Sequence, residues 1–360
     1  MNSFTDALSR KSSLRILVIK FRHHGDMLLT TPLINTLQAT WPQAKIDVLL
    51  NEETRPMLQA HPHVHQVYGL DRNWKKQGKR YRQRREWHVM TTLRRQRYDV
   101  VLNLADQWKS ALIARFTGAA IRIGFDFDKR RNWLWRRCYT HLAPVTDHQQ
   151  QHTVEQNLSI LAPLGVMTRC DRATMACSPE DRHTVSALLA QHRVSQDYIV
   201  IQPTSRWFYK CWSDEKMAAT IAALRREDRP VILTAGPDPR EQAMVEHILA
   251  LLPDRRFVLS LAGQLTLTQL AALIGGARLF IGVDSVPMHM AAALQTPCIA
   301  LFGPSKLTFW RPWQVKGTVL WAGDYGPLPD PDHIDTHTTT RYLEAIPVSA
   351  VLEQANRWLT

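Results

Sequence analysis

The segment from Phe280 to Pro304, FIGVDSVPMHMAAALQTPCIALFGP, constrains the fold of this chain more than any other. Its pattern predicts a buried strand, a turn that carries Asp284, a short helix and a second buried strand. An acid placed where an apolar strand gives way to a helix lies at the carboxyl edge of a parallel sheet, where open α/β sheets bind ligands. The segment therefore predicts a doubly wound α/β domain with a ligand site at that edge.

The same plan opens the chain, where ILVIKF is followed by the loop RHHGD and the run MLLTTPLINTLQAT. A chain of 360 residues is also long for a single core. We therefore expect two Rossmann-like, doubly wound domains facing a central cleft. The predicted boundaries are 1–175 for an N-terminal domain and 176–340 for a C-terminal domain. A final helix within 341–360 is expected to pack back towards the N-terminal domain.

Apolar runs bounded by turn residues predict the strands, and apolar periodicity predicts the helices. The predicted strands are 15–21, 45–49, 66–69, 99–104, 121–124, 198–202, 231–234, 257–259, 279–283 and 298–302. The predicted helices include 107–116, 173–195, 213–226, 241–251, 267–274 and 348–359.

Hydropathy and cysteine usage indicate a cytoplasmic protein. No stretch approaches the roughly 18 apolar residues of a membrane span, and the polar start MNSFTDALSRKSS lacks the apolar centre of a signal peptide. The five cysteines are odd in number and form no CxxC pair. This usage predicts reduced thiols, with neither disulfides nor a zinc site.

Charge divides the chain in two. Residues 1–178 carry 28 Lys and Arg against 14 Asp and Glu, whereas the remainder carries 17 against 18. Residues 72–97 hold eleven basic side chains and one acid, Glu86, and KRRNWLWRR follows at 129–137, with tryptophans interleaved in both runs. Such one-sided charge predicts a polyanionic partner. Nucleic acid, an anionic membrane surface and a phosphorylated glycan all remain open at this point.

Asp26 is the first candidate for chemistry. It follows the first strand and a glycine, Gly25, that would permit a tight turn, and it stands where the next helix begins. One interpretation is a helix N-cap. The other is a carboxylate at the sheet edge that acts as a general base. Arg22, His23 and His24 crowd the same loop with groups able to grip an anionic substrate, and they favour the second interpretation.

The stretch IQPTSRWFYKCWS forms a second candidate site. Hydroxyls at Thr204 and Ser205 follow a strand, and Lys210 precedes a helix that Ser213 is predicted to cap. Hydroxyls, a lysine and a helix N-terminus together favour phosphate binding. The stretch is not a P-loop, because the glycines and the GK[ST] of that motif are missing.

Three further features belong to the same half. TAGPDPREQ places Gly236 and Glu241 after the next strand, near where a ribose would lie, although an acid at a helix start is common. Asp284 and Ser285 follow the strand at 279–283, with Ser285 expected to cap the helix. His289 lies five residues beyond Asp284, on the side expected to face the cleft.

Several acids and histidines imitate metal sites. DFD at 126–128 and DPD at 330–332 have the acid-x-acid spacing with which many glycosyltransferases hold a divalent metal, and HPHVH at 61–65 alternates like ligands on a strand. The first acid pair adjoins a basic run and is expected to pair with it. The histidines have no acid or cysteine nearby in the sequence. We therefore predict no metal site and no cofactor.

With these motifs, the chain resembles the lipopolysaccharide core heptosyltransferases, which are inverting glycosyltransferases of the GT-B architecture. The segments that carry the resemblance occur in the family's order over nearly the whole chain: ILVIKFRHHGDMLLTTPLINTLQATWP, QPTSRWFYKCWS, TAGPDP and FIGVDSVPMHMAAALQTPCIALFGPS. RHHGDMLLTTP and GPSKLTFWRPW are most similar to the branch that adds the third, branching heptose of the inner core. Many relatives have Thr-Gly where this chain has Ser285-Val286.

The resemblance implies metal-independent, inverting transfer of L-glycero-D-manno-heptose from ADP-L-glycero-β-D-manno-heptose to a heptose of the phosphorylated lipid A–Kdo–heptose core. The resemblance also implies that the N-terminal domain, 1–175, binds the acceptor and that the C-terminal domain, 176–340, binds the donor. Asp26 then matches the base that deprotonates the acceptor hydroxyl. Residues in the second half match donor-binding positions: Thr204, Ser205 and Lys210 for the diphosphate, Asp284, Ser285 and His289 for the heptose and phosphates, Leu265 for the adenine, and Glu241 for the ribose.

An acceptor anchored at the cytoplasmic face of the inner membrane would also explain why only the N-terminal half is basic. The resemblance thus implies a peripheral enzyme on an anionic membrane surface and no nucleic-acid partner. The alternatives are the first or second heptosyltransferase step of the same core, or a GT-B sugar-nucleotide epimerase. A nucleic-acid-binding protein would share the charge but shows no recognised motif. A nicotinamide dehydrogenase would need G-x-G-x-x-G, which follows neither opening strand.

Overall fold

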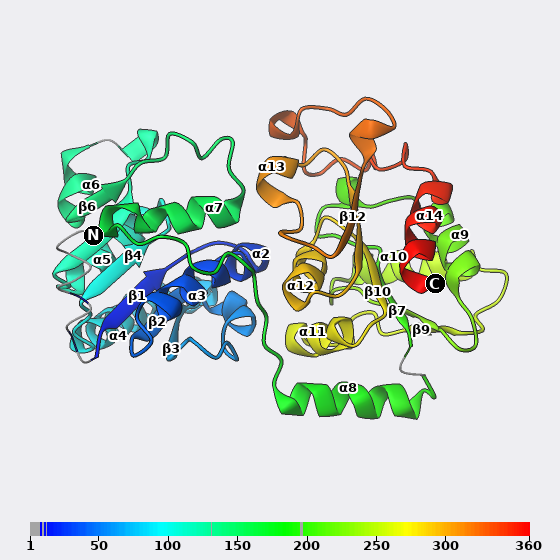
Figure 1. Cartoon of the computed structure of the whole chain (residues 1–360), viewed down its shortest axis with the longest axis horizontal. Coiled ribbons are helices and arrows are strands. Elements are labelled where there is room, and N and C mark those ends of the chain that lie inside the picture. The colour runs from blue at the N-terminus through cyan, green and yellow to red at the C-terminus, as the bar shows by residue number, and fades with distance from the viewer. Residues whose placement is uncertain (1–7, 9–10, 12, 131, 195–196) are drawn as a thin grey trace. The chain divides into compact units, whose positions relative to one another are not determined.

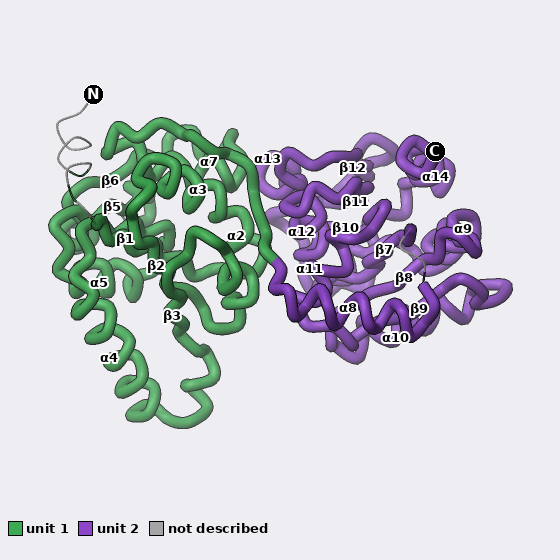
Figure 2. The backbone as a smooth tube through the Cα atoms, turned by 60° about the horizontal axis from the view of Figure 1, so that its bottom comes forward, with its two compact units in different colours: residues 1–176 green, residues 177–360 purple. Residues whose placement is uncertain are grey.

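The computed structural model describes residues 8, 11, 13–130, 132–194 and 197–360 (Figure 1). Most of the polar N-terminal segment, together with Arg131 and Ser195 of the predicted segments above, lies outside the described residues. The chain divides into two compact units, Met1–Ala176 and Cys177–Thr360 (Figure 2). The division falls one residue from the boundary expected from the sequence.

Unit 1 is built on a six-stranded sheet in the order β3-β2-β1-β4-β5-β6, with every pair parallel. Its strands are β1 (Arg15–Ile19), β2 (Lys45–Asn51), β3 (Gln66–Leu70), β4 (Val100–Asn103), β5 (Ile121–Phe125) and β6 (His141–Ala143). This is the order of a dinucleotide-binding Rossmann sheet. The direction of winding reverses between β1 and β4, so the loops after these two strands flank the position where such sheets bind ligands.

Helices cover both faces of this sheet. They are α2 (His24–Leu28), α3 (Thr31–Thr40), α4 (Lys79–Arg95), α5 (Trp108–Phe116), α6 (Trp133–Cys138) and α7 (Thr153–Leu158), with 3₁₀ helices η1 (Glu52–Met57), η2 (Arg72–Gln77), η3 (Asp128–Arg130) and η4 (Ser159–Leu164). Leu93, Ile113 and Trp135, from α4, α5 and α6, share one core with Leu17 and Ile19 of β1. These three helices therefore form a single layer.

Unit 2 repeats the plan with strands in the order β12-β11-β10-β7-β8-β9, again all parallel. The strands are β7 (Ile199–Gln202), β8 (Val231–Leu233), β9 (Val258–Ser260), β10 (Leu279–Val283), β11 (Cys298–Phe302) and β12 (Gly317–Trp321). Reading the first strand as β7 gives the same order as in unit 1. β7, β10 and β11 are buried throughout, as expected for parallel strands covered on both faces.

Several helices of unit 2 begin at a side-chain cap. They are α8 (Pro179–Gln191), α9 (Asp214–Leu224), α10 (Pro239–Ala250), α11 (Leu267–Gly275), α12 (Val286–Leu294), α13 (Leu307–Trp310) and α14 (Val348–Leu359), with 3₁₀ helices η5 (Phe208–Lys210), η6 (Ala322–Asp324) and η7 (Pro331–His333). Ser178 and Ser213 accept backbone N–H groups at the starts of α8 and α9. Such a cap stabilises a helix by about 1 kcal/mol.

The last helix, α14, belongs to the core of unit 2. Val351 and Ala355 of α14 are fully buried in the core of unit 2, and Trp212 Nε1 donates to the Ile346 carbonyl just before it. α14 packs on α9 and on β10, β11 and β12. The apolar stripe of α14 is thus used inside unit 2, and packing of 341–360 towards the first domain stays a prediction.

Two other features bear on the predictions. All five cysteines are free thiols, as their number and spacing predicted. Within the described residues, no helix is long and apolar enough to cross a membrane.

Candidate active site

Asp26 lies in the first turn of α2, shortly after β1 and at the reversal of winding in unit 1. Its side chain is buried, and Oδ2 accepts a hydrogen bond from the backbone N–H of His23 at 3.3 Å. α2 begins at His24, so Asp26 is the third helical residue and His23 is the N-cap. The N-cap interpretation of Asp26 is thus wrong by three positions, and Gly25 lies inside a helix rather than in a special turn. The carboxylate points back to the helix start.

A buried lysine accompanies Asp26. Lys20 directly follows β1, is 6% exposed, and donates from Nζ to Asn157 Oδ1 at 2.9 Å. Asn157 in turn donates to the Leu29 carbonyl, which fixes its amide. Burial lowers the pKa of Lys20 from 10.5 to about 8, and the Asp26 carboxylate opposes this shift. Lys20 therefore places a positive charge in the same low-dielectric environment as the candidate base.

The loop before Asp26 is fixed at its backbone and open at its side chains. Arg22 and His23 are exposed, while the Arg22 carbonyl accepts from Asn51 Nδ2 at 3.2 Å. His24 Nε2 lies 2.8 Å from the Glu53 carbonyl, and burial lowers the pKa of His24. The loop can therefore hold its shape while Arg22 and His23 remain available to a ligand.

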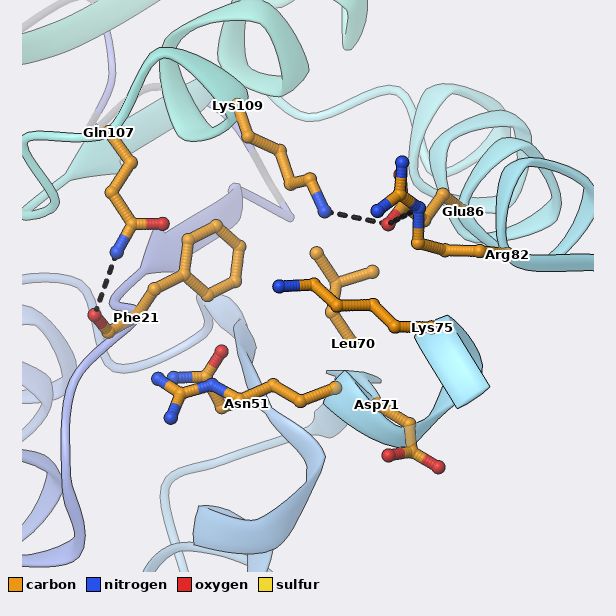
Figure 3. A pocket seen from close by; sticks show the side chains of 10 residues that line it. Phe21, Asn51, Leu70, Asp71, Lys75, Arg82, Glu86, Gln107 and Lys109 are labelled. Carbon is orange, nitrogen blue, oxygen red and sulfur yellow. Dashed lines mark hydrogen bonds and ion pairs between the residues drawn. The ribbon is translucent and has the colours of Figure 1, made fainter. Parts of the chain in front are cut away.

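A small pocket of about 140 Å³ opens beside this loop (Figure 3). Its floor comes from the carboxyl ends of consecutive strands, through Phe21, Asn51 and Leu70. Its wall is mostly polar and is lined by Asp71, Arg72, Lys75, Arg82, Glu86, Gln107 and Lys109.

Four cations and two acids line this pocket. Glu86 Oε1 is already engaged, 2.7 Å from Lys109 Nζ and 3.7 Å from Arg82 Nε. Lys75 extends into the hollow (Figure 3) and has no ion-pair partner among the described residues. The pocket is therefore suited to an anionic group.

In unit 2, Lys210 and Asp284 meet at the carboxyl edge. Lys210 Nζ lies 2.6 Å from Asp284 Oδ2, which also accepts from Ser305 Oγ at 2.6 Å. Ser205 Oγ donates to the Asp284 backbone carbonyl at 3.1 Å. β7 and β10 are adjacent strands, so the loops after them are brought together. The sheet thus unites residues that lie 74 positions apart in the sequence.

Glu241 is held by two donors from neighbouring loops. Thr204 Oγ1 donates to Glu241 Oε2 at 2.6 Å, and the backbone N–H of Gly236 donates to the same oxygen at 3.1 Å. A Cβ atom at position 236 would lie 3.0 Å from Glu241 Oε1, so glycine allows the carboxylate to approach. α10 begins at Pro239, two residues before the predicted start. The fixed carboxylate can accept from a ligand hydroxyl through Oε1.

The start of α12 differs from its prediction in detail. Ser285 occupies the N-cap position, but its Oγ donates to the Val283 carbonyl and makes no capping hydrogen bond to the helix. The N-terminal amides of α12 are therefore not capped by this side chain, and they lie at the positive end of the helix dipole. His289 lies one turn further along and is buried.

Leu265 lies apart from these groups. It is half-buried and lines a shallow cavity of about 510 Å³ with His183, Leu188 and Gln191 of α8. None of the other predicted donor-binding residues lines that cavity.

The acids and histidines whose spacing resembles that of metal ligands interact with other side chains of the protein. Asp126 lies 3.6 Å from Arg136, and Asp332 lies 2.6 Å from Lys306. In the histidine run, His61 is buried against Thr174, whereas His65 pairs with Asp47. No group of three or more potential metal ligands occurs within the described residues.

Sequence reasoning missed Lys20, Asn157 and Ser305. Lys20 carried a signal, because a lysine at the end of a buried apolar strand must find a partner. Asn157 and Ser305 carried none, because their roles depend on contacts 137 and 21 positions away.

These two sheets match known structures over almost the whole chain. A glycosyltransferase family 9 protein from Veillonella parvula superimposes with a TM-score of 0.84 at 22% identity, covering 96% of this chain and 97% of that one. E. coli ADP-heptose lps heptosyltransferase II gives 0.75 at 25% identity, covering 96% and 98%. The fold is accordingly GT-B, as the sequence predicted.

Sequence comparison identifies the family. Residues 87–339 match the model of glycosyltransferase family 9 (heptosyltransferase). The chain is 41% identical to a lipopolysaccharide heptosyltransferase 3 of E. coli over 338 residues, which cover 94% of this chain and 97% of the relative. It is 29% identical to lipopolysaccharide heptosyltransferase 2 of E. coli strain K12 over 85% of this chain and 88% of that one. This chain belongs to glycosyltransferase family 9, the heptosyltransferases.

Proposed function

We propose that this protein transfers L-glycero-D-manno-heptose from ADP-heptose to a heptose of the phosphorylated lipopolysaccharide inner core. The observation that carries the proposal is the 41% identity to lipopolysaccharide heptosyltransferase 3 over 94% of the chain. A second such relative, from E. coli K12, is 39% identical over the same share. Identity falls to 29% for a heptosyltransferase 2 and to 27% for a heptosyltransferase 1. This order favours addition of the branching third heptose.

Asp26 is the proposed general base. Inverting transfer needs one carboxylate to take the proton of the acceptor hydroxyl as its oxygen attacks the anomeric carbon. Asp26 stands at the ligand edge of unit 1, and its buried Oδ2 is oriented by the His23 N–H. Arg22, His23, His24 and Gly25 form the acceptor-binding loop in this proposal. Asp26 lies outside the residues matched by the family model.

Unit 2 is the proposed donor site. As the bond between heptose and ADP breaks, negative charge develops on the departing diphosphate, and cations and oriented N–H groups stabilise it. Lys210 has three N–H donors and gives one to Asp284, which leaves two for phosphate oxygens. The N-terminal amides of α12 supply further donors. Thr204, Ser205, Ser285 and His289 complete the proposed phosphate and sugar contacts.

The nucleoside end of the donor is assigned to Glu241, Gly236 and Leu265. Glu241 Oε1 would accept from a ribose hydroxyl, since Oε2 is already held by Thr204 and Gly236. Leu265 would contact the adenine. Leu265 lines the cavity against α8.

The pocket beside the Asp26 loop is the proposed site for an anionic group of the acceptor. It supplies Lys75 as an unpaired cation within the described chain, at the carboxyl edge where the attacking sugar must also bind. Phosphorylated inner core has the required charge. We also propose that unit 1 brings the enzyme to the cytoplasmic face of the inner membrane, where this acceptor is anchored.

Mass spectrometry after incubation with ADP-heptose tests the function. The acceptors are core lipopolysaccharides purified from strains that lack the first, second or third heptosyltransferase. The expected result is the gain of one heptose only on the core that lacks the third. Gain on either of the other cores instead would assign this chain to that step. Conversion of ADP-heptose to an isomer without any acceptor would indicate an epimerase and overturn the proposal.

A further inference from the structure

One layer of unit 1 combines exposed apolar side chains with a high density of positive charge. The layer consists of α4, α5 and α6, which pack side by side on the same face of the sheet (Figure 1). Their buried residues, such as Leu93, Ile113 and Trp135, face the core. The exposed side chains of these helices point away from that core and form the surface here called the outer layer.

Large apolar side chains concentrate on this outer layer. The nine most exposed large hydrophobic residues of the described chain include five from these three helices: Tyr81 and Trp87 of α4, Leu112 of α5, and Trp133 and Leu134 of α6. Trp133 is 63% exposed and Leu134 is 51% exposed. Scattered exposed apolar residues are ordinary, but a cluster of this kind marks an interaction surface.

The charge of the outer layer is one-sided. The three helices carry eleven Lys and Arg residues and a single acid, Glu86. Arginines lie directly over the aromatic rings, with Arg137 over Trp133 at 5.5 Å and Arg94 over Phe116 at 5.3 Å. Trp87 packs on the same Phe116 at 5.3 Å between ring centroids. Aromatic rings and guanidinium groups are thus interleaved across the helices.

We propose that this outer layer of α4, α5 and α6 is the membrane-docking face of the enzyme, with Trp133 and Leu134 entering the headgroup region of an anionic bilayer. The inference rests on the proposed function, because it supplies the surface that holds the enzyme at its lipid-anchored acceptor. Tryptophan prefers the interface between headgroups and acyl chains, and basic side chains are attracted to anionic lipids. The surface offers both in one place.

The apolar component distinguishes a bilayer from a nucleic acid. A polyphosphate backbone requires only cations, so exposed leucines and tryptophans would gain nothing on it unless bases stacked on the rings. Leu112 and Leu134 cannot stack in that way. A bilayer, in contrast, offers apolar atoms beneath the anionic groups, and a helix face with this pattern lies in the interface plane.

The outer layer also adjoins the proposed acceptor pocket. α4 contributes Arg82 and Glu86 to the wall of that pocket, while its neighbours Arg84, Arg85 and Trp87 are exposed on the outer layer. A lipid held against the outer layer would therefore present its saccharide near the pocket.

Vesicle co-sedimentation tests the proposal on the full-length protein. The vesicles are pure phosphatidylcholine, or phosphatidylcholine mixed with phosphatidylglycerol. The test variant is Trp133→Ser with Leu134→Ser. The matched control is Met167→Ser with Leu251→Ser, which removes two exposed apolar side chains outside the outer layer. A third variant, Arg84→Glu with Arg115→Glu, changes charge without touching the pocket.

Wild type and the control should bind the anionic vesicles alike, and both should bind pure phosphatidylcholine weakly. Affinity for the anionic vesicles should fall about tenfold in the Trp133/Leu134 variant and about twentyfold or more in the Arg84/Arg115 variant. Equal affinity of wild type and the Trp133/Leu134 variant would overturn the proposal. Salt-sensitive binding to duplex DNA, with no binding to anionic vesicles, would indicate a nucleic-acid surface and also overturn it.

Assays of heptose transfer distinguish failure of this inference from failure of the proposed function. With a short, water-soluble core saccharide as acceptor, the Trp133/Leu134 variant should transfer heptose at the wild-type rate. With acceptor embedded in vesicles its rate should fall with its affinity. Absence of transfer by wild type to either acceptor would refute the function and leave the vesicle result standing on its own.

Discussion

The two units share one topology and differ in almost every chemical respect. Both sheets have six parallel strands with the same order and the same point of reversal. Yet the excess of positive charge lies wholly in the first, with 28 basic against 14 acidic side chains up to residue 178. Unit 1 buries a lysine beside its acid, whereas unit 2 pairs Lys210 with Asp284 through a direct hydrogen bond. A common scaffold thus carries the proposed acceptor site and the proposed donor site, and mutations can test the two separately.

Asp26→Asn should distinguish the two proposed sites most strongly. The amide cannot take a proton, so transfer should fall by about 10²–10⁴-fold, the range for loss of a general base. ADP binding to unit 2, measured by calorimetry, should be unchanged. Glu53→Gln, a carboxylate lost from the same edge of unit 1, is the control and should retain activity. Near wild-type transfer by Asp26→Asn would remove Asp26 from the chemistry.

Lys210→Ala should act on the other unit. Loss of a cation from the diphosphate should weaken ADP binding by about 10–100-fold, as for a charge-assisted hydrogen bond, while acceptor KM stays the same. Lys316→Ala, at the opposite edge of the same sheet, serves as the control. If both variants bind ADP like wild type, the donor phosphates lie elsewhere.

Lys20→Met tests whether the buried charge serves Asp26. We expect kcat to fall about tenfold. Removal of a charge with a pKa lowered from 10.5 to about 8 relieves a burial cost of about 3 kcal/mol, partly offset by the lost hydrogen bond to Asn157. Thermal stability should therefore be retained or raised.

The pH profile gives an independent readout of Lys20. Wild-type kcat should decline as pH rises through about 8, where the lysine loses its proton. Lys20→Met should lack this decline. A variant that loses stability and activity together, with the profile intact, would indicate a purely structural lysine.

Lys75→Glu tests the proposed acceptor pocket alone. Reversal of the unpaired cation should raise KM for phosphorylated core about fivefold to tenfold, with little change in donor KM. Lys76→Glu makes the same charge change one residue away, outside the pocket lining. Equal effects of the two variants would mean that the general field of unit 1 matters and the pocket does not.

Acidification should weaken unit 1 before unit 2. Burial lowers the pKa of His61 from 6.5 to about 4, with His63 adding to the shift, and burial lowers the pKa of His24 and His148. Between its two pKa values folded His61 binds fewer protons than in the unfolded chain, so stability present above 6.5 is lost as pH falls towards 4. The loss is about 2 kcal/mol near pH 5.

Amide hydrogen exchange at about pH 5 and pH 7, corrected for intrinsic rates, measures this difference. Protection should fall in β1 and β2 and persist in β7 and β10. His61→Gln should reduce the difference in unit 1. Equal loss of protection in the two units would contradict the assignment.

Sequence patterns predicted the buried elements better than the exposed ones. β10, β11 and α14 begin and end at the predicted residues, because each is a long apolar or strongly periodic run. β6 and β12 were missed, since both are short or only half-buried and pair with a single neighbour at a sheet edge.

For the candidate site, too, some features could be predicted from the sequence and others could not. Placement at a sheet edge follows from strand and loop order, so Asp26, Lys210 and Asp284 could be proposed from sequence. The contacts of Glu241 with Thr204, and of Lys20 with Asn157, depend on which loops the sheet order makes adjacent. The residues around each position in the sequence do not indicate which loops become adjacent.

The repeated strand order has an evolutionary consequence. Each half closes its own core, and the chain passes from one to the other between Ala176 and Cys177. Recombination near that junction would exchange the whole proposed acceptor unit and leave the proposed donor unit intact. Bacterial surface glycans would thus diversify by reassortment of complete halves. Each parental gene would contribute a unit that folds by itself and has its own specificity.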